Sequence, residues 1–162
     1  MIPRIKAIIE RTCKALGEKK VFMGEEYYTF PTTEKLASLD ENFYKNLGYG
    51  YRAKYMIEVA NAILQNQINL EEIANYSTID LKKSLMSLKG VGSKVADCIS
   101  LFGYHRTDSF PVDTWIEKIY QEDFCGKLTD RVKITEWFVN EFGEYSGYVQ
   151  QYLFYYKRSL EK

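Results

Sequence analysis

The sequence predicts a single all-α protein, and three observations support this fold class. Apolar residues recur with helical spacing along nearly the whole chain of 162 residues. The alternation of apolar and polar residues that is typical of strands is almost absent, and only residues 21–30 have an irregular or extended pattern. Short glycine-containing turns, rather than long polar linkers, separate the helical stretches. We therefore expect about nine or ten helices in one compact unit.

Two apolar stripes mark the clearest helices. The first is expected to end near Gly17, because glycine is common just past the end of a helix. The stripes are formed by Ile2, Ile5, Ile8, Ile9 and Cys13, and by Tyr55, Met56, Val59, Ile63 and Leu64.

Two capping patterns predict the starts of short helices in the middle of the chain. Asn69 followed by Glu72, and Ser77 followed by Asp80, resemble capping boxes, in which side chains satisfy free backbone N–H groups. We expect the helix that begins after Ser77 to continue to Leu88, where a glycine-rich turn follows.

Three further signals divide the carboxyl-terminal half into helices. Pro111 suits the first turn of a helix, where its missing N–H is not needed. Thr129 is expected to cap the next helix, and Gly143 separates that helix from a final aromatic one. The apolar residues after Thr129 are Val132, Ile134, Trp137, Phe138 and Phe142.

Composition restricts the function classes. The chain has 22 basic and 22 acidic side chains, so any binding of nucleic acid has to be local rather than driven by net charge. There is no long apolar run, and charges begin at Arg4, so we expect neither a membrane partner nor a signal peptide. The three cysteines are odd in number and form no C-x-x-C pair, which argues against a disulfide scaffold or a metal site. We expect an intracellular protein without a cofactor.

The turn after Leu88 carries the first functional signal. The segment Lys89-Gly90-Val91-Gly92 lies between two predicted helices and, with them, forms a helix-hairpin-helix over about residues 79–103. Glycines permit positive φ and leave the backbone N–H groups of the following helix uncovered, which suits a DNA phosphate. An ordinary turn between two helices is the alternative for this segment taken alone.

Lys94, Cys98 and Asp113 carry the second signal. Lys94 and Cys98 are four residues apart and share one helical face, while Asp113 is placed to cap the next helix. The helix dipole disfavours an ammonium in the first turn, so a partly desolvated Lys94 would offer a neutral amine as a nucleophile. The Asp113 carboxylate could stabilise positive charge on a sugar as its base leaves. Taken singly, Lys94 could instead contact phosphate, Asp113 could be a plain cap and Cys98 could be a small core residue.

Several segments together resemble a known family. The pattern L-x-G-V-G-x-K-x-A-D-C, followed by P-V-D, is similar to the hairpin and catalytic segment of the helix-hairpin-helix (HhH-GPD) DNA glycosylases, specifically the 8-oxoguanine DNA glycosylase/AP lyases. Other matching segments occur in the same order, so the resemblance covers nearly the whole chain. They are IPRI from Ile2, FP at Phe30, LGYGYRAKY from Leu47 and FGEYSGYVQQYLF ending at Phe154.

The resemblance implies a fold and an activity. The fold is the two-lobed helical HhH-GPD glycosylase fold, with residues 1–162 as a single glycosylase unit that lacks the family's amino-terminal domain. The implied activity is base-excision repair: removal of 8-oxoguanine from duplex DNA and cleavage at the abasic site, without a cofactor. The implied partner is double-stranded DNA with a damaged base or an abasic site. The implied location is cytoplasmic, on the nucleoid if the source is bacterial.

The resemblance also implies roles for the residues of the pocket. Lys94 matches the nucleophile that forms a Schiff base, and Asp113 matches the aspartate that assists catalysis. Cys98 and Phe154 match residues that lie against the two faces of the extruded base, and Gln150 matches the side chain that binds its Watson-Crick edge. Base flipping requires such a stacking platform and such hydrogen bonds.

Further positions match residues that bind DNA outside the pocket. Arg4 and Arg52 match arginines that contact the orphaned cytosine, and Tyr51 matches a residue wedged into the duplex. The turn residues expected to contact DNA are Gly90, Val91 and Gly92.

The chain departs from the family at its start. It begins at Met1, too late to include the family's amino-terminal domain, its first helix and an asparagine-rich segment before Arg4, and Lys89 stands where the family often has proline. We expect either self-association through the surface left by the missing region or marginal stability. Two alternative functions remain: a truncated module that binds duplex or abasic DNA with little or no base excision, and a glycosylase for another oxidised base.

Overall fold

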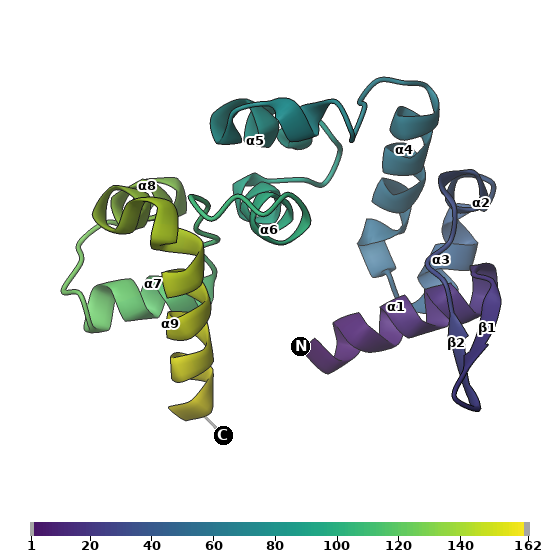
Figure 1. Cartoon of the computed structure of the whole chain (residues 1–162), viewed down its shortest axis with the longest axis horizontal. Helices are drawn as coiled ribbons and strands as arrows, with labels where there is room; N and C mark the ends of the chain where they lie inside the picture. Colours follow the sequence, from purple (N-terminus) through teal and green to yellow (C-terminus); the bar gives the residue numbers. More distant parts are fainter. Residues whose placement is uncertain (1, 161–162) are drawn as a thin grey trace. The chain divides into compact units, whose positions relative to one another are not determined.

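A computed structural model describes residues 2–160 of the chain and confirms the all-α class (Figure 1). Three single-turn 3-10 helices are interspersed among the α-helices: η1 (Gly50–Arg52), η2 (Ile73–Asn75) and η3 (Gly143–Tyr145). The α-helices are α1 (Ile2–Leu16), α2 (Thr33–Ala37), α3 (Glu41–Leu47), α4 (Ala53–Leu64), α5 (Thr78–Met86), α6 (Ser93–Gly103), α7 (Thr114–Glu122), α8 (Arg131–Phe142) and α9 (Ser146–Leu160).

The segment with an extended pattern is a β-hairpin. Strands β1 (Lys19–Phe22) and β2 (Glu25–Tyr28) pair antiparallel, and Figure 1 shows them beside the end of α1. Met23 and Gly24 form the two-residue loop, both with positive φ (53° and 83°), as tight hairpins require. The hairpin begins two residues earlier than we predicted, because its strands are exposed at nearly every position and lack the alternation that marks a strand.

The capping pattern at Ser77 is confirmed, whereas the helix predicted after Asn69 is only a single turn. The Ser77 hydroxyl accepts a hydrogen bond from the Asp80 N–H at 3.1 Å and starts α5. The segment after Asn69 forms no α-helix and only the short η2, because the chain turns extended at Tyr76 to reach the Ser77 cap. Helix α5 also ends at Met86, two residues before the predicted end at Leu88.

Two later helix starts are shifted from the predicted positions. Asp130, not Thr129, caps α8, and its carboxylate accepts a hydrogen bond from the Val132 N–H at 2.8 Å. Pro111 lies outside α7, which starts at Thr114 with Asp113 as its cap. The chain stays extended around Pro111 because the neighbouring Phe110 and Val112 are anchored in the core.

The described chain divides into two compact units rather than the one compact unit expected from the helical pattern, and this agrees with the two-lobed fold that the family resemblance implied. Unit 1 comprises the chain up to Leu70 together with Leu88–Gly90, and unit 2 comprises Glu71–Ser87 and the chain from Val91 onward. In unit 1, the fully buried Tyr44 donates its hydroxyl to the Leu36 carbonyl oxygen at 2.5 Å, so its polar atom is satisfied inside the core. The buried residues of this core are Leu36, Tyr44, Ala53 and Ala60.

Unit 2 has an aromatic core that α7, α8 and α9 surround. Phe110 stacks on Phe138 with ring centroids 4.1 Å apart, and both side chains are fully buried. The Gly147 N–H donates to the Thr107 carbonyl at 2.6 Å, and a Cβ at Gly147 would lie 2.3 Å from Leu101 Cδ1. Glycine thus lets the start of α9 approach α6 and the following loop closely. The core residues are Phe110, Val112, Ile116, Ile119, Tyr120, Ile134 and Phe138.

Candidate functional site: a lysine-lined pocket beside a helix-hairpin-helix

The turn before α6 requires glycine at Gly90. Its φ is +82°, a left-handed conformation that side chains disfavour, and a Cβ there would lie 2.4 Å from the Tyr55 ring. Gly92 differs, because its φ of −93° and ψ of 178° are open to any residue and a Cβ there would meet no atom within 4 Å. The packing of the described chain would therefore tolerate a side chain at position 92.

Gly92 is the N-cap of α6 and leaves the end of that helix open. Its carbonyl accepts the Ala96 N–H at 2.9 Å, but it has no side chain to cap the first turn. The N–H groups of that turn have no partners within the helix and carry the positive end of its dipole. Gly92, Ser93 and Lys94 are exposed, so an anion can approach these donors directly.

A buried ion pair joins the two helices of the hairpin. Lys82 Nζ of α5 lies 2.6 Å from Asp97 Oδ1 of α6, and the Asp97 side chain is only 5% exposed. Burial raises the pKa of Asp97, and the Lys82 ammonium partly offsets that rise. The Lys82 ammonium and the Asp97 carboxylate attract each other as opposite charges, but their geometry is not that of an aligned hydrogen bond. No sequence pattern indicated this pair.

The segment before α7 supplies residues both to the core and to a pocket. Phe110 and Val112 belong to the core of unit 2, while Pro111, which is also fully buried, and the half-buried Asp113 line the pocket. The Phe110 carbonyl accepts the Thr135 hydroxyl at 3.0 Å, and this bond fixes the segment against α8. Core packing thus sets the position of Asp113.

The loop that precedes this segment is anchored at two points. The Arg106 guanidinium donates to the carbonyl oxygens of Ala74 and Tyr76, at 2.7 and 3.0 Å. Asp108 accepts the Thr78 hydroxyl at 2.9 Å, which ties the loop to the first residue of α5. Both contacts hold the loop that connects α6 to the Asp113 segment.

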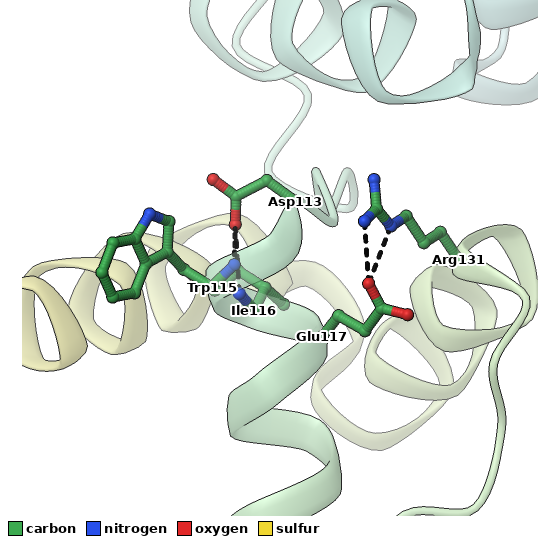
Figure 2. Close-up of polar contacts among 5 residues, drawn as sticks. All are labelled: Asp113, Trp115, Ile116, Glu117 and Arg131. Atoms are coloured by element: carbon green, nitrogen blue, oxygen red, sulfur yellow. Dashed lines mark hydrogen bonds and ion pairs between the residues drawn. The ribbon is translucent and has the colours of Figure 1, made fainter. Parts of the chain in front are cut away.

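Asp113 caps α7, as the sequence predicted. Its Oδ1 accepts the N–H groups of Trp115 and Ile116, both at 3.0 Å (Figure 2). Figure 2 shows the second carboxylate oxygen pointing away from these two N–H groups. One oxygen therefore holds the helix while the other is available to a ligand.

A second pair in the same view links α7 to α8. The Arg131 guanidinium donates through Nε and Nη2 to Glu117 Oε2, at 3.0 and 2.8 Å (Figure 2). Arg131 also lines a small hollow together with Gly92 and Lys94, on the hairpin side of α6. The hollow places a guanidinium beside the open end of that helix.

A pocket of about 160 Å³ in unit 2 brings the predicted catalytic and base-binding residues together. The convergence of Lys94, Cys98 and Asp113 that we expected from spacing is present in the structure. The lining residues are Lys94, Cys98, Phe102, Pro111, Asp113, Gln150, Gln151 and Phe154.

Two of the three α6 residues in this pocket, Lys94 and Cys98, differ in environment. Lys94 is exposed, so our expectation of a partly desolvated amine is wrong; the open end of α6 leaves it in water. Burial raises the pKa of the half-buried Cys98 thiol; the nearby Lys94 ammonium opposes this rise, and the carboxylates of Asp97 and Asp113 add to it. Cys98 thus presents a neutral thiol, a polarisable surface that suits contact with the face of a base.

Two of the three α9 residues in the pocket, Gln150 and Phe154, are packed into unit 2. Gln150 is 5% exposed and donates its Nε2 to the Pro111 carbonyl at 3.1 Å. Phe154 is half-buried, packs against the aromatic core and also lines the pocket. Phe154 is therefore both a core residue and a pocket residue.

Three lining residues were missed at the level of sequence. Phe102 follows Lys94 and Cys98 at helical spacing, so this spacing alone could have identified it. Pro111 was assigned to a helix start, and Gln151 was not singled out. Helical spacing does not predict Gln151 in the pocket. Its neighbour Gln150 already faces the pocket, and the side chains of adjacent helical residues point about 100° apart.

The remaining predicted DNA contacts gather in unit 1. Arg4 of α1 donates to the Gly48 carbonyl at 3.3 Å, close to η1 in the chain. The Arg52 guanidinium lies over the ring of Tyr51, 4.4 Å from its centroid, and Tyr51 is exposed. Arg4, Arg52 and the exposed Tyr51 therefore all belong to unit 1.

Known proteins resemble this chain in sequence and in structure. A family profile described as "HhH-GPD superfamily base excision DNA repair protein" matches residues 2–143. The chain is 33% identical over 169 residues to a Methanothermobacter thermautotrophicus protein named "Probable N-glycosylase/DNA lyase", a match covering 93% of this chain and 54% of that protein. It is 34% identical over 142 residues to "N-glycosylase/DNA lyase OGG1" of Arabidopsis thaliana, covering 81% of this chain and 39% of that protein.

A solved structure resembles the whole described chain. Clostridium acetobutylicum 8-oxoguanine glycosylase/lyase, in complex with duplex DNA containing cytosine opposite 8-oxoguanine, aligns with a TM-score of 0.95 and 36% identity, over 100% of this chain and 56% of that one. The chain spans about half the length, or less, of these three proteins. The family profile covers most of its residues, and the chain therefore belongs to the HhH-GPD superfamily of base excision DNA repair proteins.

Proposed function

We propose that this chain removes 8-oxoguanine from duplex DNA and then cleaves the abasic site through a Schiff base on Lys94. The observation that carries the proposal is the pocket in unit 2, which joins an exposed amine to a carboxylate and to base-binding side chains. A protein that only binds phosphate would need the hairpin turn but not a pocket of this composition. The similar proteins named N-glycosylase/DNA lyase and 8-oxoguanine glycosylase/lyase support the same activity.

Two side chains account for the chemistry. The Lys94 amine, in its neutral form, attacks C1′ of the damaged nucleoside; its nitrogen bonds to that carbon while the bond from C1′ to the base breaks. Positive charge develops on the sugar during this step, and the carboxylate oxygen of Asp113 that is not bound to α7 stabilises it. Opening of the sugar ring then leaves a Schiff base between Lys94 and C1′, which is the intermediate for strand cleavage.

The other pocket residues bind the extruded base. The neutral Cys98 thiol and the Phe154 ring offer two apolar surfaces for the faces of a planar base. The Gln150 amide, buried and held by Pro111, offers hydrogen bonds to its edge. A flipped base needs both kinds of contact to compensate for lost stacking and pairing.

DNA outside the pocket is held by two regions. The open first turn of α6 binds a backbone phosphate through its N–H groups, with Gly90, Val91 and Gly92 allowing close approach. Arg4 and Arg52 contact the orphaned cytosine, and Tyr51 fills the gap left by the flipped nucleotide. Among residues 2–160, no helix has the length and apolar character needed to cross a bilayer. We infer that the protein acts on DNA in the cytoplasm, on the nucleoid if the source is bacterial.

Borohydride trapping on matched duplexes tests this function. The chain is incubated with duplexes that carry 8-oxoguanine, an abasic site or guanine opposite cytosine, and excision, strand cleavage and covalent trapping are measured separately. We expect trapping on the first two duplexes and none on guanine. Trapping on the abasic duplex alone would instead support a module without base excision, and trapping with an oxidised pyrimidine alone would reassign the lesion.

Replacing Gly92 should weaken binding to all duplexes about equally. Gly92→Ala adds a methyl group where the chain has open space, so the fold is retained but close approach of a phosphate is hindered. We expect a loss of about fivefold to tenfold in affinity, measured by fluorescence anisotropy on lesion and undamaged duplexes. The affinity should depend only moderately on salt, because few side chains neutralise phosphates.

The control for this variant is Gly103→Ala at the other end of α6. A Cβ there makes only an ordinary contact, 3.7 Å from Ile99, and Gly103 lies outside the turn. Its binding should equal that of the unaltered chain. A Gly92→Ala variant that discriminated strongly among lesions would contradict the phosphate-anchor role.

A further inference from the structure

The orientation of the Gln150 amide is determined by its partner on the Asp113 segment. The Pro111 carbonyl can only accept a hydrogen bond, so the group facing it at 3.1 Å must be the NH₂ of Gln150. The carbonyl oxygen Oε1 of the same amide therefore points the other way. One hydrogen bond alone, however, leaves the amide free to rotate about the N–H···O axis.

Gln151 supplies a second contact to this amide. Its Nε2 donates to Gln150 Oε1 at 2.5 Å, although side chains of adjacent helical residues point about 100° apart. Gln151 is an exposed residue, yet it lines the pocket together with Gln150. The Gln150 amide is therefore held at both ends, by Pro111 at its nitrogen and by Gln151 at its oxygen.

We propose that Gln151 is a positioning residue that makes the pocket selective for bases with a guanine-type edge. Held at both ends, the Gln150 amide keeps one lone pair of Oε1 and one N–H for a ligand. That pair complements 8-oxoguanine, in which O6 accepts and the neighbouring N1–H donates. 8-Oxoadenine presents the reverse order, with a donor at its 6-amino group and an acceptor at N1, so an amide held in one orientation mismatches it. This inference rests on the proposed function, in which Gln150 binds the edge of the extruded base.

Two variants of Gln151 separate hydrogen bonding from packing. Gln151→Glu keeps the size of the side chain but replaces its donor with a carboxylate, which repels Gln150 Oε1, whereas Gln151→Ala removes the side chain. We expect single-turnover excision of 8-oxoguanine to fall about tenfold in Gln151→Ala and further in Gln151→Glu. Excision of 8-oxoadenine should change less than about twofold, so that selectivity falls.

Two controls belong to this experiment. Strand cleavage at a preformed abasic site, which contains no base to bind, should be unchanged in both variants. Tyr152→Ala alters the next residue of α9, which is 79% exposed and does not line the pocket, and it should behave as the unaltered chain. A purely structural role for Gln151 predicts the opposite ranking, with the isosteric Gln151→Glu close to the unaltered chain.

A measurement on the free protein distinguishes failure of this inference from failure of the proposed function. The side-chain NH₂ resonances of Gln150 report its order by NMR without any catalysis. We expect slow rotation and slow exchange of these protons in the unaltered chain and faster motion in both Gln151 variants. If the unaltered chain excises no base, the proposed function fails. If Gln150 is equally ordered in all three proteins, or if Gln151→Glu retains full selectivity, the positioning role is overturned.

Discussion

Lys94→Gln should abolish base removal, strand cleavage and borohydride trapping while leaving affinity for duplex DNA within about twofold of the unaltered value. The glutamine amide has similar length but no nucleophilic amine, so no bond to C1′ can form. Lys94 is exposed, and its replacement should not unfold α6. Excision, trapping and anisotropy measured on the same 8-oxoguanine and abasic duplexes provide the test.

A nearby lysine provides the control for this result. Lys89 is an exposed lysine in the hairpin turn and does not line the pocket. Lys89→Gln removes the same charge and should retain excision and trapping. If Lys94→Gln still forms a covalent adduct, or if Lys89→Gln loses it, another amine carries the chemistry and the assignment of Lys94 is wrong.

Lys82→Met should be the most destabilising single change considered, at a cost of about 3 to 5 kcal/mol in the free energy of unfolding at pH 7. The Lys82 side chain is 23% exposed and that of Asp97 is 5% exposed, so the pair is shielded from solvent. Without the ammonium, the Asp97 carboxylate is left buried and uncompensated. Urea denaturation followed by circular dichroism measures the loss.

The destabilisation should depend on pH in a defined direction. Burial raises the pKa of Asp97, and removing Lys82 removes the factor that opposes this rise. Between the unfolded and folded pKa values, the folded state binds more protons, so stability falls as the pH rises through that window and is regained as the pH falls. The deficit of Lys82→Met relative to the unaltered chain should therefore be smaller at pH 5 than at pH 7.

An exposed pair provides the control for Lys82. Lys83 lies 3.4 Å from Asp80, with both side chains more than half exposed, so Lys83→Met should cost less than about 1 kcal/mol. The double variant Lys82→Met with Asp97→Asn removes both charges and should recover part of the loss. Equal stabilities of the two lysine variants at pH 7 would refute a buried, mutually compensating pair.

Helix starts illustrate how far local sequence signals extend. Ser77 and Asp113 were predicted as caps and act as caps, because a short polar side chain before a helix bonds to N–H groups only two or three residues away. A cap was also predicted at Thr129, but the neighbouring Asp130, another short polar residue, is the actual cap. The helix predicted after Asn69 is only one turn long, because the chain is already extended at Tyr76, before the Ser77 cap.

The pocket shows which of its residues helical spacing can predict and which it cannot. Lys94 and Cys98 were placed on one face because both belong to α6, and Phe102 follows by the same rule. The bond between Gln150 and Pro111 joins positions 39 residues apart, and the ion pair of Lys82 with Asp97 joins the two helices of the hairpin. Neither contact has a local pattern that could have revealed it.

The amino-acid sequence was enough to predict the helical class, the glycine turn before α6 and, through the family's motifs, the residues that were expected to meet in the pocket. These depend on helical periodicity, backbone freedom and residue type, which act over a few neighbouring residues. The sequence was not enough to predict that Lys94 is exposed, that burial raises the pKa of the Cys98 thiol or that the Gln150 amide has one orientation. Exposure, protonation and amide orientation depend on which distant segments exclude water and supply partners, and that is settled only when the chain packs.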